Sequence, residues 1–214
     1  MATVILVRHG RTTANAAGIL SGRMPGVRLD DVGREQATQA AGRLAAVPLV
    51  ALVSSPLERT RQTSRIIRDA QREKLTISTS SAILEADYGE WQGQKLSDLA
   101  KEPLWSVIQR EPSKVTFPGG ETMSGMQARA VKAIRRLDAK YEGRHSKDAV
   151  WAAVSHADII KAILADALGM PLDLFQRIAV GPASISIIRY GAERPEVLAT
   201  NTDSGDLGWL AAPA

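Results

Sequence analysis

The chain has 214 residues, of which 44% are hydrophobic and 23% charged; this is an ordinary globular composition and favours one large domain over two. It contains no cysteine, which excludes a disulfide framework, a thiolate nucleophile and a cysteine-based metal site. The net charge of +4 comes from scattered basic residues and only 4% of residues are aromatic, so small anionic ligands fit the composition better than nucleic acid does.

Strands and helices are predicted to alternate along the chain. Ser55, before Pro56 and Glu58, has the pattern of a helix N-cap, and so has Ser124 before Gln127. Apolar runs predict strands at residues 4–7, 49–53, 75–79, 149–154, 184–190 and 197–200, and longer periodic segments predict helices at 31–46, at about 56–72, from 124 onward and at 157–168. The alternation predicts an α/β fold, a three-layer sandwich in which helices flank a mainly parallel central sheet.

Residues 82–121 interrupt this alternation with repeated glycine and proline. We expect an irregular excursion there, forming a small cap at about residues 85–121 over the carboxyl ends of the strands. Since no repeat or linker is evident, residues 1–214 are predicted to form a single domain that includes this cap. The large apolar side chains of the excursion either line a site or pack internally; they are Trp91, Leu96, Leu99, Trp105 and Phe117.

Two of the three histidines follow predicted strands directly. Arg8 and His9 end the first strand, and His156 comes after the strand at 149–154. Since the carboxyl ends of parallel strands share the edge where α/β sheets bind ligands, these side chains predict a phosphate pocket with a nucleophilic imidazole. Arg59, one turn into a helix, is expected near the same edge. His145 lies in a polar run and is expected in an exposed loop.

Three carboxylates that follow the third predicted strand are candidates for a proton donor. Glu85 ends an apolar segment, where partial burial raises the pKa of a carboxyl group and suits it to donate a proton. Spacing alone leaves Asp87 and Glu90 as rivals, although a solvated position is the better interpretation for Glu90.

Six segments of the chain carry these residues in a fixed order. They are Arg8-His9-Gly10-Arg11-Thr12 with Asn15; Gly22, Leu29, Gly33, Gln36 and Ala37; Ser54-Ser55-Pro56-Leu57-Glu58-Arg59 with Gln62 and Thr63; Leu84, Glu85, Gly89, Trp91 and Gly93; Pro118-Gly119-Gly120-Glu121; and Val154-Ser155-His156. Together they resemble the histidine phosphatase superfamily, whose members are similar to cofactor-dependent phosphoglycerate mutases. The segments span residues 4 to about 160, which makes an accidental match very improbable.

The resemblance implies a role for each residue of the pocket. His9 would take up a phosphoryl group as phosphohistidine, and Glu85 would protonate the leaving oxygen and then activate water. Charge in phosphoryl transfer spreads over the equatorial oxygens, so fixed cations suit this chemistry. A neutral His9 beside a protonated His156 would give a bell-shaped pH profile. The groups implied around the phosphate are Arg8, Asn15, Arg59 and His156.

Two segments depart from the family pattern. Most relatives have glycine after the second histidine, where this chain has Ala157 and then Asp158. Ala157 is compatible with a backbone cradle for substrate, whereas Asp158 either caps the helix, the better interpretation, or selects against highly anionic substrates. After Gly22, Arg23 either adds a phosphate contact or is exposed. The predicted substrate-binding set is Arg8, Asn15, Gly22, Arg23, Arg59, His156 and Ala157.

The favoured function is that of a phosphatase acting on a small phosphomonoester. The short interval between Glu85 and His156 lacks a recognisable mutase-type lid, which disfavours a phosphomutase. The mutase alternative would require 2,3-bisphosphoglycerate as a primer, whereas the phosphatase is expected to need no cofactor and no metal ion. A third alternative, a non-catalytic regulator that binds a phospholigand, is disfavoured because His9 and Glu85 are both present.

The expected partner is a small phosphorylated metabolite rather than nucleic acid or a membrane. No apolar run approaches the roughly 18 residues of a membrane span, and the amino terminus lacks a secretory pattern. A cytoplasmic location is therefore expected. Homodimerisation through an edge strand is compatible with the pattern.

Overall fold

A six-stranded sheet with the order β3-β2-β4-β1-β5-β6 forms the centre of the protein. In this computed structural model, which describes residues 2–191 and 193–211, the strands are β1 (Thr3–Arg8), β2 (Leu49–Ser54), β3 (Ile77–Thr79), β4 (Val150–Ser155), β5 (Ile185–Tyr190) and β6 (Pro195–Thr202). The first four run parallel to one another, whereas β5 is antiparallel to its neighbours β1 and β6. The prediction of a mainly parallel sheet is confirmed.

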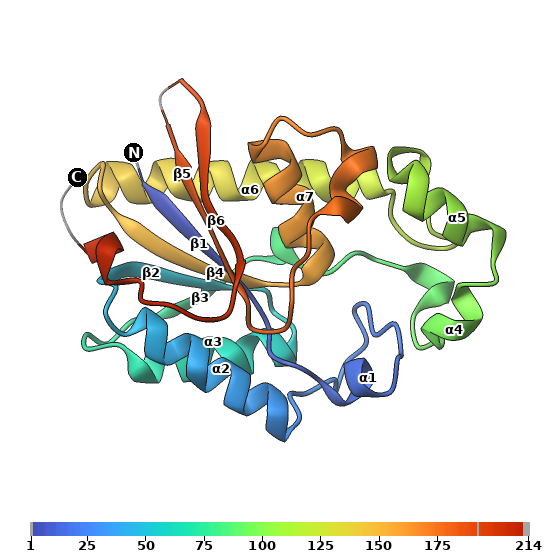
Figure 1. Cartoon of the computed structure of the whole chain (residues 1–214), viewed down its shortest axis with the longest axis horizontal. Coiled ribbons are helices and arrows are strands. Elements are labelled where there is room, and N and C mark those ends of the chain that lie inside the picture. Colours follow the sequence, from blue (N-terminus) through green and yellow to red (C-terminus); the bar gives the residue numbers. More distant parts are fainter. Residues whose placement is uncertain (1, 192, 212–214) are drawn as a thin grey trace.

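Helices cover both faces of this sheet (Figure 1). The four long ones are α2 (Asp31–Leu44) and α3 (Glu58–Ala70) on one face, and α6 (Met123–Arg144) and α7 (Ala157–Ala167) on the other. The predicted three-layer α/β arrangement is therefore confirmed. Shorter helical segments are α1 (Thr13–Ala16), η4 (Leu172–Arg177) and η5 (Gly208–Ala211).

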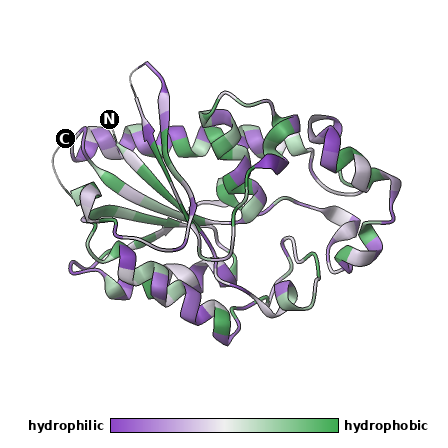
Figure 2. Ribbon diagram, viewed as in Figure 1, coloured by the Kyte–Doolittle hydropathy of each residue, from purple (hydrophilic) through white to green (hydrophobic). Residues whose placement is uncertain are grey.

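The strands supply apolar side chains to both layers. Val4 and Leu6 of β1 belong to the core under α6 and α7, whereas Ile5 and Val7 belong to the core under α2 and α3. This alternation follows from the strand repeat of two, which sends successive side chains to opposite faces. A sheet covered on both faces needs nearly continuous apolar strands, and Figure 2 shows the central strands as predominantly hydrophobic.

The excursion between β3 and α6 is more ordered than its sequence indicates. It contains η1 (Ser81–Ile83), η2 (Gly89–Trp91), α4 (Leu96–Leu99), α5 (Pro103–Arg110) and η3 (Pro112–Lys114), so the expectation of an irregular segment was wrong. Trp91 stacks on Trp105 with ring centroids 6.4 Å apart and meets the Phe117 ring at 5.7 Å. These aromatic side chains therefore pack the cap internally, and Trp91, Leu99 and Phe117 share one buried core with β1 and β4.

Three predicted helix caps were wrong. Ser55 does not cap α3, which begins at Glu58 after an N-cap at Leu57 that has no side-chain hydrogen bond. The N-cap of α6 is Thr122, whose hydroxyl accepts from the amide of Gly125, rather than Ser124. Asp158 lies within the first turn of α7, two residues past the N-cap, because the extended residue before that helix is His156. Ser55 and Asp158 instead face the site described below.

No helix in residues 2–191 or 193–211 has the length and apolar character required to cross a membrane.

Candidate active site

The two histidines are brought together by the pairing of β1 with β4. Arg8 lies opposite Ser155 in the parallel register, and the amide of His9 donates to the carbonyl of Ser155 at 3.0 Å. His9 and His156 therefore leave adjacent strands at the same level. Their ring centroids are 5.3 Å apart and the rings are inclined at 64°. The two histidines therefore lie side by side at one edge of the sheet, as predicted.

His9 has both ring nitrogens engaged, which defines its tautomer. Its Nδ1 lies 2.7 Å from the carbonyl oxygen of Gly10; since a carbonyl only accepts, Nδ1 carries the proton. Its Nε2 then accepts from Nε of Arg59 at 3.2 Å. Burial, followed by the charges of Arg59 and Arg8, lowers the pKa of His9 well below its ordinary value. The imidazole is thus neutral, with a lone pair on Nε2.

The two arginines present unsatisfied donors inside the protein. Arg59 is 1% exposed; besides its contact with His9, its Nη2 donates to the carbonyl of Gly22 at 2.6 Å. Arg8 donates through Nη1 to the carbonyl of Val180 at 2.7 Å. Nη1 of Arg59 and Nε of Arg8 are buried without a hydrogen-bond partner within the part of the chain that the structure describes. Buried donors of this kind are rare unless a ligand completes them, and guanidinium groups match phosphate oxygens.

His156 is fully buried behind the first histidine. Its Nε2 lies 2.8 Å from Oγ of Ser55, and its Nδ1 lies 4.0 Å from a carboxylate oxygen of Glu85. Burial and then the charge of Arg59 lower the pKa of His156 well below its ordinary value. The low pKa favours a neutral His156 in the protein alone. Protonation of His156 beside a bound phosphate stays a prediction, since a phosphate dianion supplies the charge that favours the protonated form.

Only one of the three candidate carboxylates lines the cavity. Glu85 is 8% exposed, and burial, reinforced by the charge of Asp158, raises its pKa to about 7. Asp87 lies 3.1 Å from a guanidinium nitrogen of Arg23, and Glu90 is exposed. The geometry therefore favours Glu85 over its two rivals as a proton donor.

A cavity of about 180 Å³ lies at the carboxyl ends of β1 and β4, and His156, although predicted to bind substrate, is not part of its lining. The lining residues are Arg8, His9, Asn15, Ile19, Leu20, Ser21, Gly22, Arg59, Glu85, Tyr88, Leu96, Ala157 and Asp158. Tyr88 was not anticipated, although it lies three residues after Glu85 in a recognised segment. The role of Ser55 against His156 was also missed, because its local pattern is that of a helix cap.

Arg23 lies outside this lining. Its guanidinium donates to the carbonyl oxygen of Glu85 at 2.9 Å and pairs with Asp87 at 3.1 Å and with Glu121 at 3.0 Å. Arg129 binds the same glutamates, donating to the Glu85 carbonyl at 3.2 Å. This placement does not support the predicted phosphate contact of Arg23. It indicates that the two arginines hold the Glu85 segment in position.

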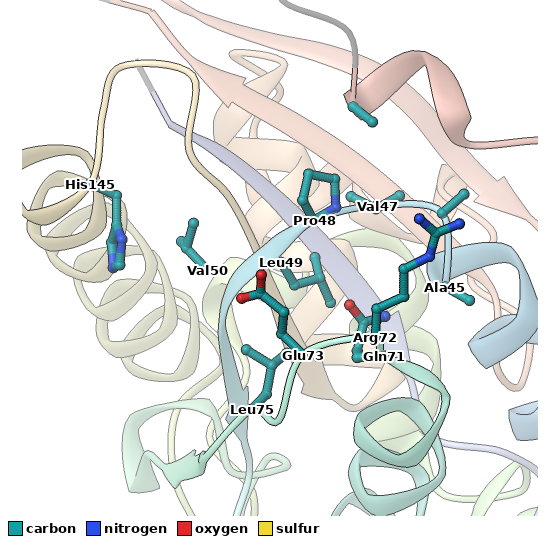
Figure 3. Close-up of a pocket in the computed structure, with 12 residues that line it drawn as sticks. Ala45, Val47, Pro48, Leu49, Val50, Gln71, Arg72, Glu73, Leu75 and His145 are labelled. Carbon is teal, nitrogen blue, oxygen red and sulfur yellow. The ribbon is translucent and has the colours of Figure 1, made fainter.

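A larger hollow of about 550 Å³ lies at the opposite end of β2. Figure 3 shows that it is bordered by the segment entering β2, by the turn after α3, and by His145 at the end of α6. His145 is exposed, as predicted. In the described residues no group of three or more histidine, aspartate and glutamate side chains is arranged to hold a metal ion.

The sequence matches the family model of the histidine phosphatase superfamily (branch 1) over residues 4–203. The chain therefore belongs to this superfamily, which confirms the resemblance. The solved α-ribazole phosphatase of Shigella flexneri is 25% identical with a TM-score of 0.80, over 94% of this chain and 97% of that chain.

Characterised branches of the family are represented among the relatives. The chain is 30% identical over 173 residues to a glucosyl-3-phosphoglycerate phosphatase of Mycolicibacterium vanbaalenii, covering 79% of this chain and 76% of that protein. It is 30% identical over 167 residues to phosphoglycerate mutase-like protein 4 of Arabidopsis thaliana, covering 76% and 69% respectively. The chain spans 50% of the length of a bifunctional protein of Mycobacterium tuberculosis, to which it is 32% identical over 193 residues, or 89% of this chain.

Proposed function

We propose that the protein hydrolyses a small phosphomonoester through a phosphohistidine formed on His9. The observation that carries the proposal is the hydrogen bonding of this imidazole, whose Nδ1 proton is donated to the Gly10 carbonyl while Nε2 keeps a lone pair beside Arg59. A neutral nucleophile placed among cations is what attack on a phosphate dianion requires.

In the first half-reaction Nε2 of His9 attacks phosphorus as the ester P–O bond breaks. The leaving alkoxide takes the proton of Glu85, whose pKa of about 7 keeps the acid form available at neutral pH. In the second half-reaction the Glu85 carboxylate removes a proton from water. The resulting hydroxide displaces His9 from phosphorus, which releases inorganic phosphate and restores both side chains.

The charge that develops on the phosphoryl oxygens is met by Arg8 and Arg59. Their unpartnered buried nitrogens are the proposed oxygen ligands, and donors placed in advance in this way are typically worth 10²–10³-fold in rate. His156 would donate its Nδ1 proton once phosphate binding raises its pKa. Asn15, Gly22 and Ala157 line the same cavity and are proposed as further binding groups. The mechanism requires no metal ion or organic cofactor, because these side chains supply the charge.

The His9→Ala variant tests this function with p-nitrophenyl phosphate as substrate. We expect phosphate release to fall by at least ~10³-fold, while His145→Ala, which removes an exposed histidine far from the cavity, leaves it unchanged. A radiolabelled phosphoryl group that is labile in acid and stable in base should be trapped on the unmodified protein only. Unimpaired hydrolysis by folded His9→Ala protein would sink the proposal.

A mutase-like relative that is 30% identical to the chain supports a phosphomutase as the alternative function. It uses the same first half-reaction and returns the phosphoryl group to a second oxygen of the substrate. Interconversion of 2- and 3-phosphoglycerate, primed by 2,3-bisphosphoglycerate and faster than phosphate release, would select it over the phosphatase. Single-domain organisation with a cap at about residues 85–121 is part of the proposal; cytoplasmic location and homodimerisation stay predictions from the sequence.

A further inference from the structure

The cavity lining includes groups that the proposed phosphoryl transfer does not use. They are the apolar side chains Ile19, Leu20 and Leu96, together with Tyr88 and Asp158. The organic part of a phosphomonoester bound through its phosphate would meet these groups. Asp158 is unusual among them, because a carboxylate lining the cavity of an enzyme for anionic esters opposes the charge of its own substrate.

Asp158 is held at the cavity by a contact from the cap. The hydroxyl of Tyr88 donates to Oδ2 of Asp158 at 2.7 Å. Tyr88 is itself only 5% exposed, and its ring meets Phe117 edge-on with centroids 4.9 Å apart. The carboxylate therefore has a defined position, supplied by packing rather than by capping of α7.

The charge of this carboxylate is only partly balanced. Lys161 lies 3.7 Å from Oδ1 of Asp158, outside the cavity lining, and its ammonium also donates to Gln176 at 3.0 Å. Arg8 is attracted to Asp158 but uses Nη1 on the Val180 carbonyl. Tyr88 contributes a neutral hydroxyl, since burial raises its pKa well above the ordinary value. The Asp158 carboxylate thus contributes a negative charge to the cavity lining.

We propose, on the basis of the function above, that Asp158 selects phosphate esters of small amino alcohols or polyols and excludes phosphate esters of hydroxy acids. An ammonium or hydroxyl group of the substrate donates to the Asp158 carboxylate, whereas a substrate carboxylate is repelled by it. Ile19, Leu20 and Leu96 contact the carbon skeleton. A cavity of about 180 Å³ has room for a small organic group beside the phosphate.

Three two-carbon esters of nearly equal size test this selection: phosphoethanolamine, 2-hydroxyethyl phosphate and phosphoglycolate, which carry an ammonium, a hydroxyl and a carboxylate group. kcat/KM is measured for each with the unmodified protein and with Asp158→Asn, Tyr88→Phe and Asp98→Asn. Asp98 provides a matched carboxylate of the cap, 60% exposed and outside the cavity lining. Thermal unfolding verifies that each variant is folded.

Asp158→Asn should raise kcat/KM for phosphoglycolate roughly tenfold and lower it for phosphoethanolamine roughly tenfold, the size expected for one charge at short range. The ratio between these two esters then moves about 100-fold, while Asp98→Asn leaves it unchanged. Tyr88→Phe removes the hydroxyl that holds Asp158. It should move the ratio in the same direction as Asp158→Asn but by less, because the charge remains and only its fixed position is lost.

Equal losses for all three esters in Asp158→Asn would overturn the inference, since Asp158 would then act only by supporting the cap or Glu85. An original preference for phosphoglycolate would overturn it as well. Failure of the proposed function is distinguishable, because in that case the unmodified protein releases no phosphate from p-nitrophenyl phosphate or from any of the three esters.

Discussion

Glu85 is a buried carboxyl group whose environment suits the proton transfer proposed for it. Its pKa of about 7 results first from burial and then from the charge of Asp158, and both effects outweigh the opposing charges of Arg59 and Arg8. A catalytic acid works best when its pKa lies near the working pH. The acid form of Glu85 dominates below about pH 7, and the carboxylate, which would activate water in the proposed mechanism, dominates above it.

The loss of kcat/KM on replacement of Glu85 by glutamine should therefore depend on the leaving group of the substrate. With an alkyl phosphate we expect a loss of about 10²–10⁴-fold in kcat/KM, but a smaller loss with p-nitrophenyl phosphate, whose leaving group needs no proton. In the unmodified enzyme, kcat/KM for the alkyl ester should fall as the pH rises through about 7, because Glu85 loses its proton.

Glu90→Gln is the matched control for this experiment, since Glu90 is an exposed carboxylate of the same segment. It should retain both the rate and the pH profile. An alkaline limb that persists unchanged in Glu85→Gln would assign the titration to another group.

Ser55 and Asp158 show where residue-level prediction failed. Both lie in a local sequence pattern that is typical of helix caps, and the prediction depended on that local pattern alone. Ser55 instead faces His156, 101 positions further along the chain, and Asp158 faces Tyr88, 70 positions back. A buried imidazole or phenol needs a hydrogen-bond partner, and the fold brings these groups together in a way that local sequence does not encode.

At the level of elements, α2 is packed directly against the loop that carries His9. A Cβ at Gly33 would collide with the backbone carbonyl of Arg11, and a Cβ at Gly10 would collide with the carbonyl of Gly33. The amide of Arg11 also donates to the side chain of Gln36 on α2 at 3.0 Å. The first turn of this helix therefore determines where the loop after β1 can lie.

Gly33→Ala should consequently weaken both folding and catalysis. We expect about 1–3 kcal/mol less stability from the overpacked backbone contact and a fall of roughly tenfold in kcat/KM as the loop shifts away from His9's present position. Urea denaturation and steady-state kinetics measure the two effects.

Gly42→Ala, in the same helix, is a control for which we expect the opposite change in stability. Nothing lies within 4 Å of a Cβ at Gly42, so the higher helix propensity of alanine should stabilise the protein by about 0.5–1 kcal/mol. Equal behaviour of the two variants would show that the Gly33 contact has no role.

Prediction from sequence was most successful for the sheet and least successful for the cap. The strands that carry His9 and His156 are buried on both faces and so appear as continuous apolar runs. The short helices α4 and α5 lack such a signal, because they are mostly exposed and lie among prolines and glycines. Pro103 is the first residue of α5, a position that proline favours. In the sequence alone, however, a proline is also typical of a loop.

At the scale of the whole molecule, a buried carboxyl group outside the active site limits stability. Asp138 is 3% exposed and accepts from the indole of Trp151 at 2.8 Å. Burial raises its pKa to about 6 despite this hydrogen bond, and the charge of Glu142 adds to the effect. The folded state therefore binds the proton of Asp138 more tightly than the unfolded chain, whose ordinary value is 3.8.

The free energy of unfolding should accordingly decrease as the pH rises from about 4 to about 6, by roughly 3 kcal/mol for this group. Asp138→Asn keeps an acceptor for Trp151 and removes the titration, so it should be more stable than the unmodified protein at pH 7.5 and similar to it at pH 4. Urea midpoints at both pH values measure this. Asp148→Asn, at an exposed position, should differ equally from the unmodified protein at both pH values, and the same result for Asp138→Asn would contradict the assignment.

The pairing of Arg8 with Ser155 has a consequence for how this protein can diverge in evolution. A slip of one residue between β1 and β4 would move one histidine by about 3.3 Å and turn it to the other face of the sheet. The backbone hydrogen bonds between β1 and β4 thus determine the distance between His9 and His156, and this distance is retained as long as those bonds are. Substitutions at Tyr88, Leu96 or Asp158 leave those bonds untouched, so on the proposed function the cap and the start of α7 could change to accept new substrates while the proposed phosphoryl-transfer chemistry is retained.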